Sequence, residues 1–223
     1  MVEPVETTPV LYRWPQSAAV GRTVPKTKFY EHGNVRTALR EKFVEDVQRI
    51  TWAYKLAEST IRLKGTEAVP EIQVFAVETK GGEVPDDVLA AIDKSVHFPI
   101  LFEISRGEEV CTVAAQKTLG GNTPKVGTYF TTGWYPITAD RQPLPVAIDL
   151  PALYESLLTS LFPVATRRGE SVSDATGRMD RARKLEREIA ALERKLRNEP
   201  QLNRKVELRK VLKEHQAALE ALV

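Results

Sequence analysis

What this chain of 223 residues lacks excludes several kinds of protein. It has one cysteine, Cys111, so no disulfide can form within it, and we expect a buried apolar role for the thiol. The three histidines, His32, His97 and His215, are far apart and have no cysteine partner, so no zinc-site spacing is present. No run of about 18 apolar residues occurs, which argues against a membrane span. The acidic, proline-containing N-terminus does not resemble a signal peptide, so we expect a cytoplasmic protein.

The motifs of common enzymes are also missing. Neither G-K-[ST] nor G-x-G-x-x-G occurs, so no nucleotide-binding motif is present. Gly120, Gly121 and Gly127 lie near Lys125 and could cradle a phosphate, but a flexible hairpin loop is the simpler interpretation. There is no serine nucleophile elbow and no plausible triad. We therefore predict no cofactor and no metal ion, and we favour a protein that is not an enzyme.

Charge is unevenly spread along the chain. Hydrophobic residues make up 42% of it, enough for a core, and the formal net charge is +2. Residues 167–223 contain 15 lysines and arginines against 10 acidic residues, whereas the rest of the chain contains 17 against 20. The basic tail suits an anionic partner, and a solvated helical surface is the plainer alternative.

The stretch from residue 70 to residue 105 predicts the centre of the fold. An apolar run at 71–78, a helical run at 85–96 and a second apolar run at 99–104 indicate a strand, a crossover helix and a parallel strand. Pro85 suits the first turn of that helix, because its missing N–H costs nothing there. Further strands are expected at 111–117 and 128–135. The fold class is therefore mixed α/β (α+β), with a mixed β-sheet, a central β-α-β unit and flanking helices.

Four other segments are expected around this unit. Residues 1–27 look like an irregular arm that Leu11, Tyr12 and Trp14 anchor on the body. Apolar residues spaced by three and four predict a helix from Val35 to about residue 54, with Asn34 as its N-cap. Residues 59–63 would form a short strand or turn. A short helix is expected at 149–161.

The C-terminal part reads as a separate helical unit. Residues 166–177 are small, polar and linker-like, so we place a boundary between a body at 1–165 and a unit at 166–223. Apolar residues then follow an a/d pattern on both sides of Pro200: Leu185, Ile189, Leu192, Leu196, and Leu208, Leu212, His215, Leu219, Leu222. This predicts an antiparallel, coiled-coil-like hairpin that packs on itself, on the body or, through residues 178–223, on a second copy.

One group of charged residues resembles a metal-dependent nuclease site. Glu78 and Lys80 form an E-x-K at the end of a predicted strand, Glu71 begins that strand, and Glu45 lies on the preceding predicted helix. In such nucleases the carboxylates hold Mg²⁺ and the lysine orients the attacking water. A strand end that reaches solvent through charged residues explains the same pattern.

Two further groups of charged residues are candidates. Asp93, Glu103 and Lys117 could form a cluster, for which an ion pair across neighbouring strands is the simplest interpretation. Cations gather on the last predicted helix and could meet phosphates of a nucleic acid: Arg204, Lys205, Arg209, Lys210 and Lys213.

An ordered set of short motifs runs through the chain. It comprises Lys28-Phe29-Tyr30, the run from Phe43 through Trp52 to Leu56, residues 71–75, Ile92-Asp93-Lys94, residues 99–103, Tyr129-Phe130 with Trp134, and residues 203–208. Together the motifs resemble a bacterial family, the domain of unknown function 4391 family, from about Leu11 to Leu222. Gly133 and Pro200 depart from the family pattern, in which an acidic and a basic residue are expected. The departures weaken the case for a charged site near Trp134 and for a continuous basic tail.

The resemblance implies a genomic context and no specific activity. Genes of the family tend to lie beside helicase-like and DNA methyltransferase-like genes, in loci that resemble restriction or phage-defence islands. No catalytic residue is implied. We therefore expect a non-catalytic accessory subunit of a DNA-processing or phage-defence assembly, with a helicase-like or methyltransferase-like protein partner and possible nucleic-acid contact. A metal-dependent nuclease and a purely structural oligomerisation protein are the alternatives.

Overall fold

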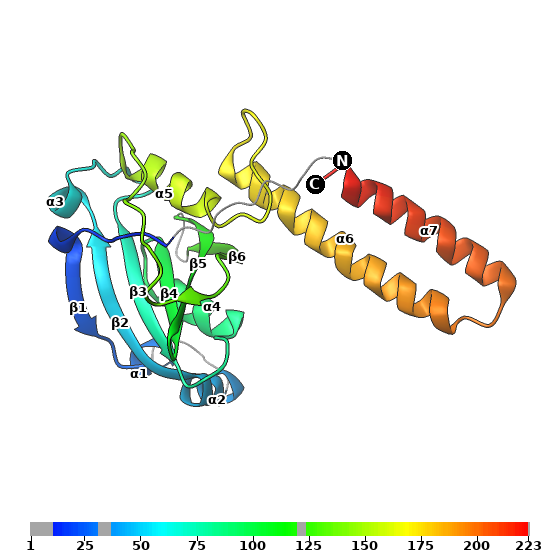
Figure 1. Cartoon of the computed structure of the whole chain (residues 1–223), viewed down its shortest axis with the longest axis horizontal. Helices are drawn as coiled ribbons and strands as arrows, with labels where there is room; N and C mark the ends of the chain where they lie inside the picture. Colours follow the sequence, from blue (N-terminus) through cyan, green and yellow to red (C-terminus); the bar gives the residue numbers. More distant parts are fainter. Residues whose placement is uncertain (1–10, 31–36, 120–123, 223) are drawn as a thin grey trace. The chain divides into compact units, whose positions relative to one another are not determined.

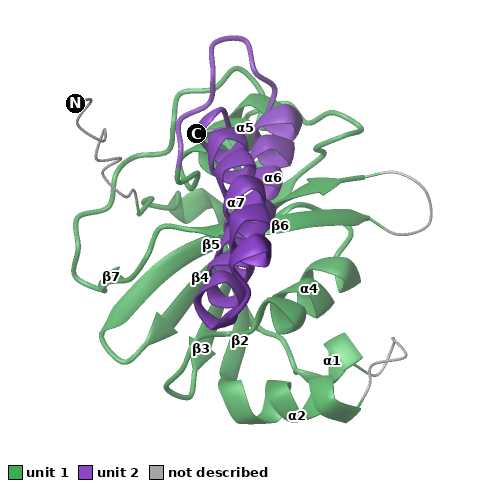
Figure 2. Ribbon diagram, turned by 90° about the vertical axis from the view of Figure 1, so that its right-hand side faces the viewer, with its two compact units in different colours: residues 1–163 green, residues 164–223 purple. Residues whose placement is uncertain are grey.

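The computed structural model describes residues 11–30, 37–119 and 124–222 (Figure 1). The chain divides into two compact units, residues 1–163 and residues 164–223, which are coloured separately in Figure 2. Each unit is described by itself below. Val35 and the expected N-cap Asn34, His32, and the glycines Gly120 and Gly121 lie outside the described residues.

A seven-stranded mixed sheet forms the first unit, the body. The strands are β1 (Ala19–Thr23), β2 (Val47–Leu56), β3 (Ile72–Thr79), β4 (Ile100–Arg106), β5 (Glu109–Thr118), β6 (Lys125–Thr131) and β7 (Tyr135–Pro136). The first six lie in sequence order across the sheet, and β7 pairs with β5. β3 and β4 are parallel and joined through α4 (Asp86–Ser95), whereas the other pairs are antiparallel. The mixed α/β class and the central β-α-β unit are therefore confirmed.

Helix α4 covers one face of the sheet. Its buried residues Leu89 and Ile92 pack with Phe75 and Phe102 of the parallel strands and with Phe43 from α2 (Thr37–Asp46). The other helices of the body are η1 (Gln16–Ala18), α1 (Thr27–Tyr30), α3 (Glu58–Ile61) and α5 (Leu150–Thr159). Asp149 caps α5, because its Oδ1 accepts a hydrogen bond from the Ala152 N–H at 2.8 Å.

The expected helix at 35–54 is wrong in its second half. α2 ends at Asp46, and residues 47–56 form β2, which pairs with β3. β-branched and aromatic residues, which favour strands, make up half of this stretch. A register shift between Val47 and Arg49 lets Val47 and Ile50 reach the same core although they are three positions apart. This bulged strand therefore has a spacing of apolar residues that is also typical of a helix.

Two smaller expectations are also corrected. The N-terminal segment is only partly an arm, because residues 19–23 pair with β2 as the edge strand β1. Leu11, Tyr12 and Trp14 are buried, as expected of anchors. Residues 58–61 form a helical turn and not a strand, since the Thr60 hydroxyl accepts a hydrogen bond from the Ala57 N–H at 2.9 Å.

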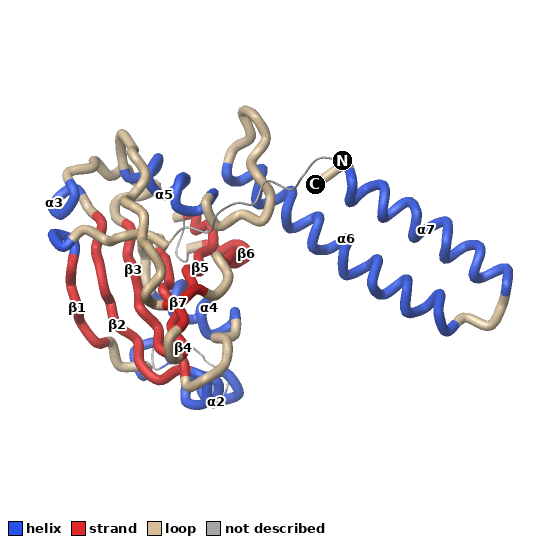
Figure 3. Tube along the Cα trace, viewed as in Figure 1, coloured by secondary structure: helices blue, strands red, loops and turns tan. Residues whose placement is uncertain are grey.

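The second unit is a pair of long helices. α6 (Val172–Asn198) and α7 (Leu202–Glu220) run side by side in opposite directions (Figures 1 and 3). The break between them falls at Glu199–Pro200, as the sequence predicted. Within the described ranges, no helix has the length and apolar character needed to cross a membrane.

Candidate functional site

The leucine seam joins the two helices of the hairpin but remains partly exposed to solvent. The predicted a/d residues lie along it, and none of them is buried: α7 contains no buried residue, and those of α6 end at Met179. A pair of helices cannot cover both sides of its own seam. Leu202 and Val206 on α7 are 71% and 58% exposed, so apolar surface also continues away from the seam.

Arg178 closes the base of the hairpin. Its Nε donates to Glu170 Oε1 at 2.7 Å, and its Nη1 and Nη2 donate to the carbonyl oxygens of Leu222 and Ala165 at 2.8 and 3.1 Å. The Arg178 guanidinium lowers the pKa of Glu170 to about 2. Arg167 also donates to the Ala221 carbonyl, at 2.8 Å. The carbonyls at the end of α7 are thus satisfied by cations, which also suits the helix dipole.

His215 crosses the seam midway along the hairpin. Its Nδ1 donates to the Val211 carbonyl at 2.9 Å, and its Nε2 lies 3.2 Å from Glu188 Oε2 of α6. His215 therefore lies between the two helices, as predicted, and makes a polar contact with the opposite one.

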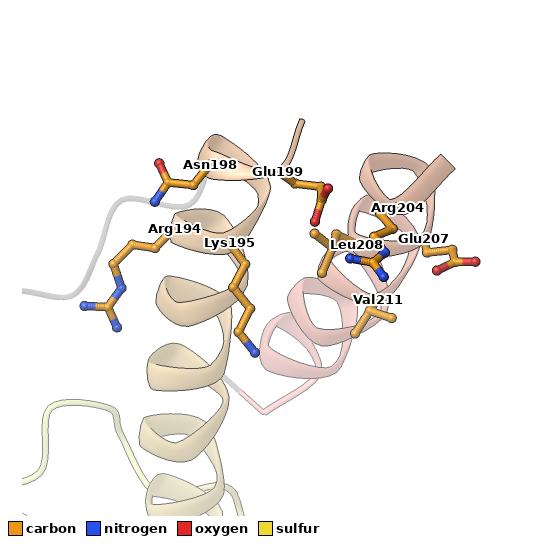
Figure 4. Close-up of a pocket in the computed structure, with 8 residues that line it drawn as sticks. All are labelled: Arg194, Lys195, Asn198, Glu199, Arg204, Glu207, Leu208 and Val211. Carbon is orange, nitrogen blue, oxygen red and sulfur yellow. The ribbon is translucent and has the colours of Figure 1, made fainter. Parts of the chain in front are cut away.

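A groove of about 630 Å³ opens at the turn of the hairpin (Figure 4). Its lining combines cations, carboxylates and apolar side chains: Arg194, Lys195, Asn198 and Glu199 at the end of α6, and Arg204, Glu207, Leu208 and Val211 on α7. An apolar floor with charges of both signs at its rim is typical of a protein interface. The mixed signs suit a protein surface better than a bare phosphate.

The five predicted nucleic-acid-binding cations divide into two sets. Lys205, Arg209 and Lys213 are spaced by four residues and share one side of α7, with Lys210 beside them. Arg204 lines the groove instead. Within the described part of the chain, none of the five forms an ion pair. Lys205 is half-buried, whereas Arg209, Lys210 and Lys213 are exposed and thus available to an anionic partner.

The residues of the proposed nuclease site are not brought together. Glu71 precedes β3 and Glu78 lies near its far end, which separates them by roughly 23 Å along the strand. Glu71 forms an ion pair with Lys55 at 2.7 Å, and Glu78 forms one with Arg49. Glu45 is exposed on α2.

The remaining member of that candidate site, Lys80, has a backbone partner. It donates to the Val44 carbonyl at 2.7 Å. No group of three or more potential metal-binding side chains occurs among the residues that can be described.

The second candidate cluster separates into two structural contacts. Lys117 and Asp93, both with fully buried side chains, form an ion pair at 2.9 Å, and Lys117 also donates to the Val96 and Phe98 carbonyls. The lysine thus caps the C-terminal end of α4. Burial raises the pKa of Asp93, while the neighbouring ammonium opposes that shift. The Tyr129 hydroxyl donates to the second carboxylate oxygen at 2.9 Å.

Glu103 does not join this pair, contrary to the expected cluster. It accepts from Arg141 Nη1 at 2.6 Å and from Trp14 Nε1 at 2.7 Å. Neither ion pair links neighbouring strands, because Asp93 comes from a helix and Arg141 from a loop. The expected grouping of Asp93 with Lys117 is therefore correct, whereas the partner of Glu103 was missed because Arg141 lies 38 residues away in a loop.

The sequence interpretation missed the base of the hairpin. It placed Glu170 and Arg178 in or beside a linker, whereas α6 already begins at Val172. A signal was present: Ser171 and Asp174 match the S-x-x-[DE] pattern of a helix start, and Ser171 Oγ accepts from the Asp174 N–H at 3.1 Å. The groove at the turn has no comparable sequence pattern.

The comparisons with known proteins identify a family without naming an activity. No curated protein and no solved structure matches the chain. One family model, described as "Domain of unknown function (DUF4391)", matches residues 13–219. This span includes the sheet, α4 and nearly all of the hairpin, so the chain belongs to the DUF4391 family.

Proposed function

We propose that this protein is a non-catalytic accessory subunit of a bacterial DNA-processing or phage-defence assembly, and that its helical hairpin holds a protein partner. The observation that carries the proposal is the open seam: leucines at a/d positions remain partly exposed, beside a groove with an apolar floor. A helical partner that completes the bundle would bury them. The gene setting that the family resemblance implies makes a helicase-like or methyltransferase-like protein the first partner to test.

Several charged residues of the body are consistent with a non-catalytic role, because they form ion pairs within the protein. The polar groups first considered for catalysis each have a protein partner: Glu71 with Lys55, Glu78 with Arg49, and Asp93 with Lys117. Ion pairs of this kind hold strands and helices together. The hairpin, in turn, leaves both its cations and its apolar residues available for contacts.

Co-purification tests the partner contact. The chain would be expressed with its neighbouring genes, as the natural sequence, as L202D/V206D and as V146D/I148D. All four side chains are highly exposed, so both variants should fold, but the first pair lies on the hairpin and the second on the body. We expect L202D/V206D to lose the partner and V146D/I148D to keep it. Retention of the partner by both variants would show that Leu202 and Val206 are not part of the partner-binding surface. Failure of every neighbouring gene product to co-purify would contradict the proposed assembly.

Nucleic-acid contact is the second part of the proposal. R209E/K210E/K213E should weaken binding to a labelled DNA duplex and make the salt dependence about two to three units shallower, because each lost phosphate contact removes about 0.9 of slope. K64E/K94E/K125E, with the same change in net charge on exposed positions of the body, is the control. Anisotropy titrations at about 50 and 200 mM salt measure both effects. Equal behaviour of the two variants would leave no role for α7 in binding DNA.

A purely structural oligomerisation protein is the second candidate, and the same open seam favours it. Two hairpins could close each other's seams in a four-helix bundle. Sedimentation equilibrium over a range of concentrations distinguishes the two cases. A concentration-dependent dimer, together with no DNA binding, would support self-association alone.

A further inference from the structure

A second recessed site lies in the body. Between the start of α4 and strands β5 and β6 is a pocket of about 220 Å³. Leu89, Ile104 and Val113 form an apolar floor beside Cys111, and Tyr129 and Trp134 provide aromatic walls. Pockets for small molecules usually hold about 300–1,000 Å³, so this one has room for a single side chain.

Two carboxylates give the pocket its charge. Glu83 and Asp86 both line it and are exposed. Within the described residues neither of them forms an ion pair or accepts a hydrogen bond, whereas the neighbouring Asp87 is paired with Lys42. Arg106, a cation that acts on Cys111 of this pocket, is already paired with Glu109 at 2.9 Å. An incoming cation would therefore meet two carboxylates without partners.

The aromatic wall already binds a cation of the protein itself. The Arg106 guanidinium carbon lies 4.0 Å from the centre of the Trp134 ring, a cation–π contact. The Tyr129 hydroxyl donates a hydrogen bond to Asp93, so the tyrosine contributes its aromatic ring to the lining of the pocket. The pocket thus combines an apolar floor for methylene groups, aromatic faces for a planar cation and carboxylates for its charge.

We propose that this pocket binds one arginine side chain of a partner polypeptide. Its three methylenes match the apolar floor, and its guanidinium can stack on an aromatic ring while donating to Glu83 or Asp86. Lysine would meet the carboxylates but lacks the planar group that stacks. This contact is made by the body and stands independently of the hairpin function.

Binding of a blocked tripeptide, acetyl-Gly-Arg-Gly-amide, tests the proposal on the full chain. The citrulline tripeptide has nearly the same shape without the charge, and agmatine carries the guanidinium without a polypeptide. We expect the arginine tripeptide to shift the Trp134 indole N–H resonance and to bind about tenfold more tightly than the citrulline form. The indole signals of Trp14 and Trp52 should not move. Tighter binding of agmatine would contradict a polypeptide ligand, and equal binding of arginine and citrulline would overturn the proposal.

A variant pair assigns the binding to this pocket. E83Q/D86N should weaken the tripeptide about fivefold, whereas E58Q/E67Q, with the same charge change at exposed positions outside the pocket, should not. Unchanged binding of the arginine tripeptide by E83Q/D86N would exclude the site.

Discussion

The body and the hairpin use their charged and apolar residues in opposite ways. In the body, charges that leave the solvent find fixed partners, as Lys117 does with Asp93, and large apolar residues such as Leu101 are fully buried. In the hairpin, leucines of the seam remain partly exposed, and Arg209, Lys210 and Lys213 of α7 form no ion pair with any acidic residue that the structure describes. The first arrangement stabilises a fold by itself, whereas the second leaves apolar and cationic surface that the partner proposed above would cover.

The strongest test of this contrast is removal of the buried lysine. K117M keeps the methylene stem but leaves Asp93 and the Val96 carbonyl without their cation, and we expect a loss of about 3–5 kcal/mol in the free energy of unfolding. All three tryptophans lie in the body, so urea unfolding followed by tryptophan fluorescence reports on it. The exposed neighbour K94M is the control. A cost below about 1 kcal/mol would show that the pair is not structural.

A pair of leucine truncations compares the two units directly. L101A, at a fully buried position of β4, should cost about 2–5 kcal/mol because it leaves a cavity. L212A, on the partly exposed seam of α7, should cost about 1 kcal/mol, since much of that side chain already contacts water. Tryptophan fluorescence and helical circular dichroism follow the two units. If L212A cost as much as L101A, the seam would be a closed core and the open-surface argument would fail.

The smallest expected effect is a pH dependence at the hairpin base. Since Arg178 lowers the pKa of Glu170 to about 2, their pair contributes stability above the ordinary glutamate pKa of about 4.5, and the contribution is lost as pH falls from there towards 2. E170Q should therefore melt earlier than the natural chain at pH 6, and the difference should shrink as pH approaches 2. Helical circular dichroism during heating measures it. If the difference in melting temperature between E170Q and the natural chain did not change with pH, ionisation of Glu170 would not contribute to the stability of the hairpin.

The sheet was the most predictable part of the fold. Residues 70–105 specified the parallel pair and α4, because a strand, a helix and a strand of fitting lengths admit few arrangements. The helix expected at 35–54 failed since Val47 and Ile50 satisfy a helical spacing and also a bulged strand, and only the pairing of β2 with β3 decides between them. Local spacing therefore predicted elements better than it predicted their partners.

The candidate sites were less predictable for the same reason. Glu71 and Glu78 look close in sequence, but an extended strand carries them to opposite ends of the sheet. The pocket that contains Glu83 and Trp134 assembles residues 51 positions apart, and no motif marks it. The hairpin seam could be recognised because its residues follow one another along two helices. Whether such a seam stays open depends on how many helices share it, which its spacing does not reveal.

The edge of the sheet at β1 has a consequence for the protein in a crowded cell. The strand is exposed along its whole length, and its pairing with β2 shifts register around Gly21, whose φ of 65° turns the backbone out of a regular strand. A bent edge that also carries Arg22 is a poor template for strands of other molecules. This edge is therefore less open to strand pairing with other copies of the chain than a regular, flat edge strand would be.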